Sequence, residues 1–178
     1  MRALAAGNLV LEPLEATHAG AMFEVLTEPA LYRHLDYPPP PTVEHLAGVY
    51  ARLEERKSPD GSEHWLNWVV SPLGQAPVGY VQATVMPSGI AWIGYVFSKQ
   101  HWGKGYATHA VQAMVEHLPL EYGVSRFLAS VEADNAASIR LLARIGFRIA
   151  TNMELQGHDL SPTERLFIRE VRAVQNAL

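Results

Sequence analysis

The sequence predicts a mixed α/β domain: a mostly antiparallel sheet with one central parallel strand pair and helices on both faces. Two observations carry this prediction. Short hydrophobic runs separated by Gly- and Pro-rich turns, typical of antiparallel strands, fill residues 64–98. A strand, a strongly amphipathic helix and another strand then follow over residues 90–133, and that order requires a crossover between parallel strands.

The N-terminal part of the chain is expected to contain one strand and two helices. Leu9–Leu14 has the pattern of a strand, and Thr17 is suited to cap an amphipathic helix that Pro29 ends. The proline tract at 38–41 fits neither a helix nor a central strand. We therefore expect a stiff loop there, followed by a second helix that Thr42 caps.

The middle of the chain is expected to form three strands joined by short turns and then a helix. The strands are predicted at Trp65–Val70, Val78–Met86 and Ile90–Phe97. From Ala107 onward, apolar residues recur at i, i+3, i+4, i+7, i+8 and i+11. This spacing predicts one apolar stripe on a helix that Pro119 ends.

The last part of the chain is expected to contain three strands and a helix. The strands are predicted at Phe127–Ala133, Phe147–Leu155 and Glu164–Val171. Asp134 or Asn135 is suited to cap a helix between the first two of these strands, and that helix runs to about Ile145. Gly146 supplies the left-handed residue that ends it.

Composition narrows the chemistry and the location. The 178 residues, 48% of them hydrophobic, suffice for a single domain over 1–178 with its own core. The absence of cysteine excludes an acyl-cysteine intermediate, and the eight histidines show no metal-ligand spacing, so no metal site is expected. A net charge of −4 argues against nucleic-acid binding, and residues 64–98 contain too many turn residues for a membrane span. We expect no export signal and a cytoplasmic location.

A glycine-rich segment joins the third of the middle strands to the strongest helix. It reads Gln100-His101-Trp102-Gly103-Lys104-Gly105-Tyr106-Ala107. Its two glycines permit a tight turn whose N–H groups point one way, and the helix that begins there adds the positive end of its dipole. This combination binds phosphate, although an ordinary strand-to-helix turn has the same composition. The dinucleotide and Walker patterns do not fit, because Thr108 and Gly105 occupy positions where those patterns need other residues.

A second segment, Asn135-Ala136-Ala137-Ser138 followed by Gly146-Phe147, indicates by itself only a capped helix with a glycine stop. Together, in this order and spacing, the two segments resemble the GNAT superfamily of N-acetyltransferases. The family's acetyl-coenzyme A motif, Gln or Arg-x-x-Gly-x-Gly or Ala, matches Gln100, Gly103 and Gly105. Residues 93–117 and 135–147 are similar to the ribosomal-protein N-terminal acetyltransferases of the RimJ/RimL type.

The resemblance implies a GNAT-like fold in which the parallel strands that end near Phe97 and Ala133 splay apart around acetyl-CoA. The strand backbone would follow the pantetheine arm and offer an N–H to the thioester oxygen. The loop amides would hold the pyrophosphate, and Asn135 and Ser138 would line the acyl end. The cofactor-binding residues that it implies are Val96, Phe97, Trp102, Gly103, Lys104, Gly105, Tyr106, Ala107, Asn135 and Ser138.

The catalytic groups are less completely specified. Many family members carry a Tyr four residues before the Gly-Phe pair, where it can protonate the departing thiolate, but this chain has Leu142. Ser138 is the nearest hydroxyl and the candidate for that role, with simple capping or cofactor contact as the alternative. The general base is open among Glu132, His101, His64 and water. An α-amine with a pKa near 8 costs only about 1 kcal/mol to deprotonate at pH 7, so a water relay could suffice.

These observations predict an N-acetyltransferase that moves an acetyl group from acetyl-CoA directly to a primary amine, above all a protein or peptide N-terminal α-amine. Without cysteine, ternary-complex kinetics are expected. A small-molecule amine acetyltransferase and a non-catalytic acyl-CoA-binding module remain as alternatives. Tyr32–Pro41 and Leu155–Pro162 are expected to wall the acceptor site. The sequence leaves open the acceptor, the acyl-chain preference and whether the chain forms a homodimer.

Overall fold

A computed structural model describes residues 1–35 and 37–171 of the chain. The strands are β1 (Leu4–Ala6), β2 (Leu9–Pro13), β3 (His64–Pro72), β4 (Gly79–Val85), β5 (Ile90–Phe97), β6 (Arg126–Glu132), β7 (Arg148–Ile149) and β8 (Glu164–Glu170). The α-helices are α1 (Ala19–Leu26), α2 (Val43–Leu53), α3 (Tyr106–Tyr122) and α4 (Ala136–Arg144). Three short 3₁₀ turns, η1 (Ala16–His18), η2 (Pro29–Arg33) and η3 (Lys99–His101), complete the described elements.

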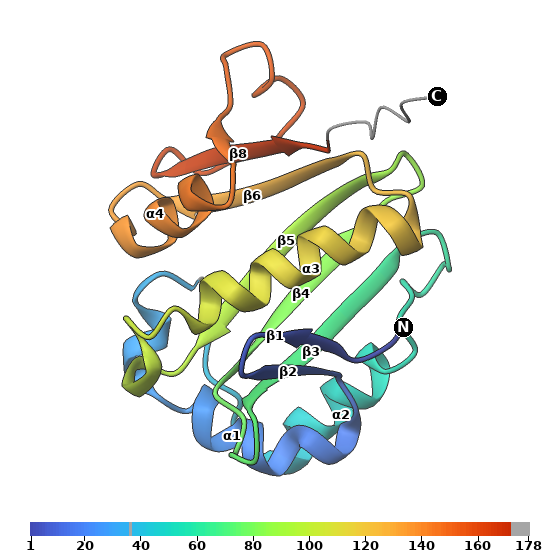
Figure 1. The fold of residues 1–178 in the computed structure, drawn as a ribbon, viewed down its shortest axis with the longest axis vertical. Coiled ribbons are helices and arrows are strands. Elements are labelled where there is room, and N and C mark those ends of the chain that lie inside the picture. The colour runs from blue at the N-terminus through green and yellow to red at the C-terminus, as the bar shows by residue number, and fades with distance from the viewer. Residues whose placement is uncertain (36, 172–178) are drawn as a thin grey trace.

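The strands form one mixed sheet in the order β1-β2-β3-β4-β5-β6-β8-β7 (Figure 1). Every pairing is antiparallel except that of β5 with β6, which α3 connects. The predicted fold class is therefore confirmed, including the single parallel pair at the crossover. No helix in the described ranges is both long and apolar enough to cross a membrane.

Helices cover both faces of the sheet, as expected. On one face, α3 and α4 bury a core with alternate residues of the strands, including Trp68 and Phe127, and α4 contributes Leu142. On the other face, α1 and α2 pack on Val69, Tyr80 and Val96 to form a second cluster. The alternation of side chains along each strand therefore separates a face covered by α3 from a face covered by α1 and α2. We call these the α3 face and the α1–α2 face.

The central parallel pair opens after a short contact. β5 pairs with β6 only from Ile90 to Trp92, opposite Arg126 to Leu128. Beyond that point β5 stays paired with β4 as far as Phe97, and β6 stays paired with β8 as far as Glu132. The two halves of the sheet therefore diverge, and Figure 1 shows β6 and α4 leaning away from β5 and α3. The expected splay is confirmed, and we call the space between these strand ends the β5–β6 gap.

The N-terminal elements differ in part from those expected. β1 was not predicted because three residues are too few to show a period, and it pairs with β2 through a turn at Gly7. Thr17 is not a cap; it lies inside η1, and the Glu15 N–H donates to His18 Nδ1 at 3.0 Å. The cap at Thr42 is confirmed, because its Oγ1 accepts from the His45 N–H at 3.1 Å.

Two predicted boundaries in the C-terminal half are wrong. Pro119 lies inside α3, which continues to Tyr122 and ends at Gly123 with a φ of 66°. Proline removes only one backbone hydrogen bond near the end of a helix, and here the left-handed glycine sets the stop. β7 covers two residues, because the carboxylate of Glu154 accepts from Arg148 and from the Thr151 N–H, and the chain coils back into turns. Gly146, with a φ of 87°, ends α4 as predicted.

Candidate active site

The β5 edge of the gap presents main-chain groups without a strand partner. In the β4–β5 ladder, the Ser98 N–H donates to the Val78 carbonyl and the Met86 N–H to the Ile90 carbonyl, both at 2.9 Å. Antiparallel pairing alternates, so even-numbered residues of β5 direct their N–H and C=O groups to β4. The odd-numbered residues direct theirs toward β6, where the last paired position, Trp92 opposite Leu128, uses the Ile93 N–H. The N–H groups of Tyr95 and Phe97 lie beyond that position and are directed into the gap. These N–H groups can bind an extended chain or stabilise a developing oxyanion.

Val96 and Phe97 therefore occupy different positions at the gap. Val96 pairs with Tyr80 of β4, and its side chain is buried on the α1–α2 face. Phe97 faces the gap with its main chain, and its carbonyl accepts from the Trp102 indole N–H at 2.7 Å. Trp102 is half exposed, and this bond ties the glycine-rich loop to the end of β5. The binding roles expected of both strand residues stay predictions.

The loop between η3 and α3 presents free backbone donors. Gly103 and Gly105 have φ values of 77° and 80°, a left-handed conformation that other residues adopt only with strain. Within the described chain, the N–H groups of residues 103–107 donate to no other group. The first turn of a helix leaves such N–H groups unpaired and adds the positive end of its dipole. The loop therefore has the geometry of an anion site, and the side chain of Lys104 adds a positive charge.

The start of α4 lies beside the gap and positions Ser138. Asn135 caps the helix, with its Oδ1 accepting from the Ser138 N–H at 3.1 Å. Leu142 is fully buried in the core of the α3 face, so it has an ordinary packing role. The side-chain hydroxyl of Ser138 is not used by the cap and remains available for chemistry.

Tyr95 is a site residue that the motif comparison did not single out. It lies on β5, on the α3 face, next to Ser138. Its hydroxyl is buried and forms no well-aligned hydrogen bond within the described chain. Burial raises the pKa of Tyr95 to about 12, and Ser138 opposes this shift. Two neutral hydroxyls thus meet near the gap. The sequence does contain a signal for this position. Side chains alternate between the two faces of a strand, so Tyr95 lies on the same face of β5 as Phe97.

The three side chains considered as general bases lie in different places. Glu132 ends β6, has the same strand parity as Leu128, and so belongs to the α1–α2 face. His101 stacks on Tyr106 in the loop at a centroid distance of 6.0 Å, and its Nδ1 is buried without a partner. Burial, with Lys104 second, lowers the pKa of His101 and favours the neutral ring.

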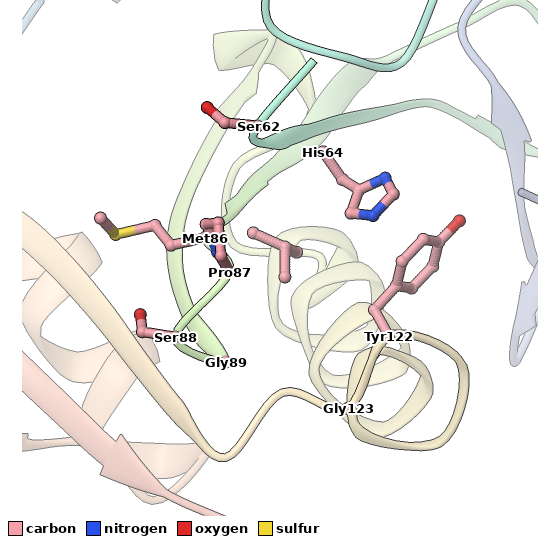
Figure 2. Close-up of a pocket in the computed structure, with 9 residues that line it drawn as sticks. Ser62, His64, Met86, Pro87, Ser88, Gly89, Tyr122 and Gly123 are labelled. Carbon is pink, nitrogen blue, oxygen red and sulfur yellow. The ribbon is translucent and has the colours of Figure 1, made fainter. Parts of the chain in front are cut away.

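His64 lies far from the gap. It begins β3 opposite Val85, whose partner in β5 is Ala91, whereas the gap lies at the other end of β5. Figure 2 shows its ring beside that of Tyr122, with a centroid distance of 5.3 Å. The two rings line a cavity of about 490 Å³ at that end of the sheet. This cavity is therefore remote from the loop, and we expect no role for His64 in catalysis.

A second cavity, of about 390 Å³, lies on the α1–α2 face. Its described lining includes Tyr32 and Pro38–Pro41 from the α1–α2 connection, together with residues of α2, β3 and β4. We call it the acceptor cavity, because the sequence predicts that this connection walls the acceptor site. Arg33 Nη2 lies 3.7 Å and His34 Nδ1 lies 3.3 Å from the carboxylate of Asp134, which precedes the cap of α4. The exposed Arg33 pair adds little stability, but both contacts bring the α1–α2 connection, part of which lines the cavity, against the start of α4.

The segment Leu155–Pro162, which is expected to wall the acceptor site, packs elsewhere in the structure. Leu160 packs with Leu128 and Ile168 on the α1–α2 face, and the rings of His158 and Trp92 meet at a centroid distance of 5.5 Å. The segment covers β6 and β8, and it does not line the acceptor cavity. Its role toward an acceptor stays a prediction. Within the described ranges, no cluster of His, Cys, Asp or Glu could hold a metal ion.

Comparisons with known proteins agree with this arrangement. A family model described as an acetyltransferase (GNAT) domain matches residues 8–148. A relative from Bacillus licheniformis, described as the uncharacterized N-acetyltransferase p20, is 25% identical over 150 residues, which are 83% of each chain. A spermidine N-acetyltransferase SpeG chimera from Vibrio cholerae and hSSAT has a TM-score of 0.73 at 15% identity, covering 92% of this chain and 96% of that one.

A further solved structure is RimL, a ribosomal-protein α-N-acetyltransferase in complex with coenzyme A. It has a TM-score of 0.78 at 21% identity and covers 95% of this chain and 98% of its own. At these identities the solved structures support the fold, whereas the family match spans most of the chain, including the glycine-rich loop and α4. The protein therefore belongs to the GNAT family and is an N-acetyltransferase.

Proposed function

We propose that the protein transfers an acetyl group from acetyl-CoA to the α-amine of a peptide or protein N-terminus. One observation carries the proposal: the unpaired edge of β5 leads directly into a loop of free amides, with Trp102 joining the two. A long ligand with a diphosphate at one end and a reactive carbonyl at the other matches this arrangement. Coenzyme A thioesters have this form, and the RimL structure was determined with coenzyme A.

The residues present fit acetyl-CoA. The unpaired N–H groups of residues 103–107 and the Lys104 ammonium would hold the diphosphate. The N–H groups of Tyr95 and Phe97 would hold the pantetheine arm and the oxygen of the reacting carbonyl, because they face the gap beyond the last β5–β6 pair. This assignment transfers the role expected of Val96 to its odd-numbered neighbours. When bound, acetyl-CoA supplies the electrophilic thioester carbon.

Proton transfers are assigned to two sides of the gap. Ser138 would protonate the departing thiolate, with the buried Tyr95 hydroxyl beside it as a second donor in a chain. Glu132, on the α1–α2 face where the acceptor enters, is the side chain best placed to accept a proton from the amine, directly or through water. Transfer is direct, because the chain has no cysteine to carry the acetyl group.

A small-molecule amine is the second class of acceptor that this site could serve. The SpeG chimera is described as a spermidine N-acetyltransferase and shares this fold, so a small amine is the alternative acceptor. A non-catalytic acyl-CoA-binding role would follow if Leu142, in place of the family's Tyr, meant that the thiolate could no longer be protonated. The Ser138 hydroxyl weighs against this, since the cap uses only the backbone N–H of Ser138 and leaves its hydroxyl beside that of Tyr95 as a proton donor.

A coupled assay tests the proposal. Purified protein is incubated with acetyl-CoA and either N-terminal peptides or free amines, while thiol release and acceptor mass are measured. We expect acetylated α-amines, and initial-rate lines that intersect when both substrates are varied. Parallel lines with an isolable acyl-enzyme would contradict direct transfer. Binding of acetyl-CoA without acetylation of any acceptor would contradict the function itself.

A further inference from the structure

Four tyrosines contribute to the walls of the acceptor cavity. Tyr32 and Tyr37 come from the α1–α2 connection, Tyr50 from α2 and Tyr80 from β4. The rings of Tyr32 and Tyr37 meet edge to face at a centroid distance of 6.1 Å. Leucine, valine and proline side chains complete much of the remaining lining. A ligand here would therefore contact a mainly apolar surface with aromatic rings.

Charged groups are scarce around this cavity. Among the residues that the structure describes, no Asp, Glu, Lys or Arg lines it; His45, Asn67, Gln82 and the phenols supply its polar atoms. Burial raises the pKa of Tyr32 and of Tyr80, so these phenols are neutral at physiological pH. A charged side chain inside the cavity would lose hydration, and no described residue of the lining carries an opposite Asp, Glu, Lys or Arg charge to compensate for it. A cation–π contact offsets that loss only in part.

The hydroxyl groups of the cavity are paired with one exception. The Tyr32 hydroxyl donates to the Leu26 carbonyl at 2.5 Å, and the hydroxyls of Tyr37 and Tyr80 lie 2.9 Å apart. Tyr50 is only 4% exposed, and its hydroxyl has no hydrogen-bond partner within the described chain. A buried hydroxyl without a partner is costly, so a ligand atom that pairs with it would bind favourably.

The floor of the cavity adjoins the reacting strand. Tyr80 and Gln82 of β4 lie opposite Val96 and Gly94 of β5, and paired strands lie about 4.8 Å apart. A Cβ at Gly94 would lie 3.0 Å from Gln82 Nε2, so this glycine keeps β5 free of a side chain at that point. The distance from the cavity to the gap is thus comparable to the length of one amino-acid side chain.

We propose that the acceptor cavity selects acceptors whose amine is flanked by an uncharged aromatic or large aliphatic group, as in a peptide that begins with phenylalanine, tyrosine or leucine. This inference rests on the proposed function, since it names the acceptor for the same gap. A tyrosine in the first position would also pair its hydroxyl with that of Tyr50. Polyamines and peptides that begin with lysine, arginine or glutamate are poor acceptors.

A set of matched peptides tests the inference with the full-length protein. The peptides differ only in the first residue, which is Phe, Tyr, Leu, Lys or Glu, and spermidine is included. We expect kcat/KM for the neutral first residues to exceed that for Lys, Glu and spermidine by about tenfold or more, the range that apolar pockets reach. Equal values, or a preference for a charged acceptor, would overturn the inference while leaving acetyl transfer established. No transfer to any acceptor, with acetyl-CoA bound, would overturn the proposed function itself.

Two variants on one helix separate the cavity from its surroundings. Val49 lines the cavity, whereas Val43 is exposed at the start of α2 and does not. Val49→Asp is expected to reduce the ratio of kcat/KM for the Phe peptide to that for the Lys peptide by about tenfold. Val43→Asp should leave the ratio unchanged, and equal ratios in the two variants would contradict the cavity assignment. If Val49→Asp fails to fold, the peptide series with the wild-type protein still tests whether the cavity selects uncharged first residues.

A separate variant tests the proposed contact between the Tyr50 hydroxyl and a tyrosine in the first position of the acceptor. Tyr50→Phe keeps the ring and removes the hydroxyl that lacks a partner. In the wild-type protein the Tyr peptide should exceed the Phe peptide in kcat/KM by about threefold or more, and the variant should bring this ratio close to one. The same ratio in both proteins would overturn the hydroxyl contact.

Discussion

The Gly105→Asp variant is expected to bind acetyl-CoA about 100-fold more weakly than the wild-type protein, as measured by titration calorimetry. Gly105 has a φ of 80°, so any side chain strains the loop, although a Cβ there finds open space with only His109 within 4 Å. The carboxylate would also face the diphosphate at the start of α3. Strain and repulsion therefore act together on the same anion site. Gly103→Asp, with a φ of 77°, should behave alike.

Gly61→Asp is the matched control for this experiment. Gly61 has a φ of 73° and open space around a Cβ, but it lies in the loop before β3, at the end of the sheet where His64 is found. Its variant introduces the same strain and charge away from the proposed site. We expect unchanged acetyl-CoA affinity in Gly61→Asp. Equal losses in both variants would show that the effect comes from the fold and not from the loop.

Ser138→Ala is expected to lower kcat by about 10²-fold, while the Kd for acetyl-CoA changes by less than about threefold. The N-cap survives, because the bond to Asn135 comes from the backbone N–H of Ser138. The variant therefore removes only the hydroxyl assigned to thiolate protonation. Initial rates at saturating acetyl-CoA and peptide measure the effect.

Control variants separate proton donation from packing. Ser88→Ala removes an exposed hydroxyl at the end of the sheet away from the β5–β6 gap and should leave kcat unchanged. Tyr95→Phe removes the hydroxyl beside Ser138 and should lower kcat less than Ser138→Ala does, because Tyr95 acts through Ser138. A kcat within threefold of wild type for Ser138→Ala would restrict Ser138 to a capping role.

Much of the site-forming fold could be predicted because local chemistry determines it. The strand, glycine loop and helix from Ile90 to Tyr122 follow from a change of hydrophobic period at a pair of left-handed glycines. Asn135 was predictable as a cap from its residue type and place. The splay followed from the family resemblance, and the pairing of β5 with β6 over three positions confirms it. These features depend on short segments whose residues interact with near neighbours.

Features that depend on tertiary contact could not be predicted in the same way. His64 is one of the candidate bases from the sequence, yet the register of β3 carries it to the end of the sheet away from the β5–β6 gap. The acceptor cavity joins four tyrosines separated by up to 48 positions, from Tyr32 to Tyr80, and none shows a motif. The meeting of Tyr95 with Ser138 needs α4 to pack beside β5. Only the assembled sheet and helices bring these side chains together.

The most direct measurement is a crystal structure of the protein with coenzyme A. We expect the diphosphate on the N–H groups of residues 103–107 and the pantetheine arm in the β5–β6 gap, bonded to the main chain of Tyr95 and Phe97. The sulfur should lie near the Ser138 hydroxyl, with the acceptor cavity open on the α1–α2 face. Coenzyme A bound at the His64–Tyr122 cavity, or a pantetheine arm outside the gap, would contradict the account.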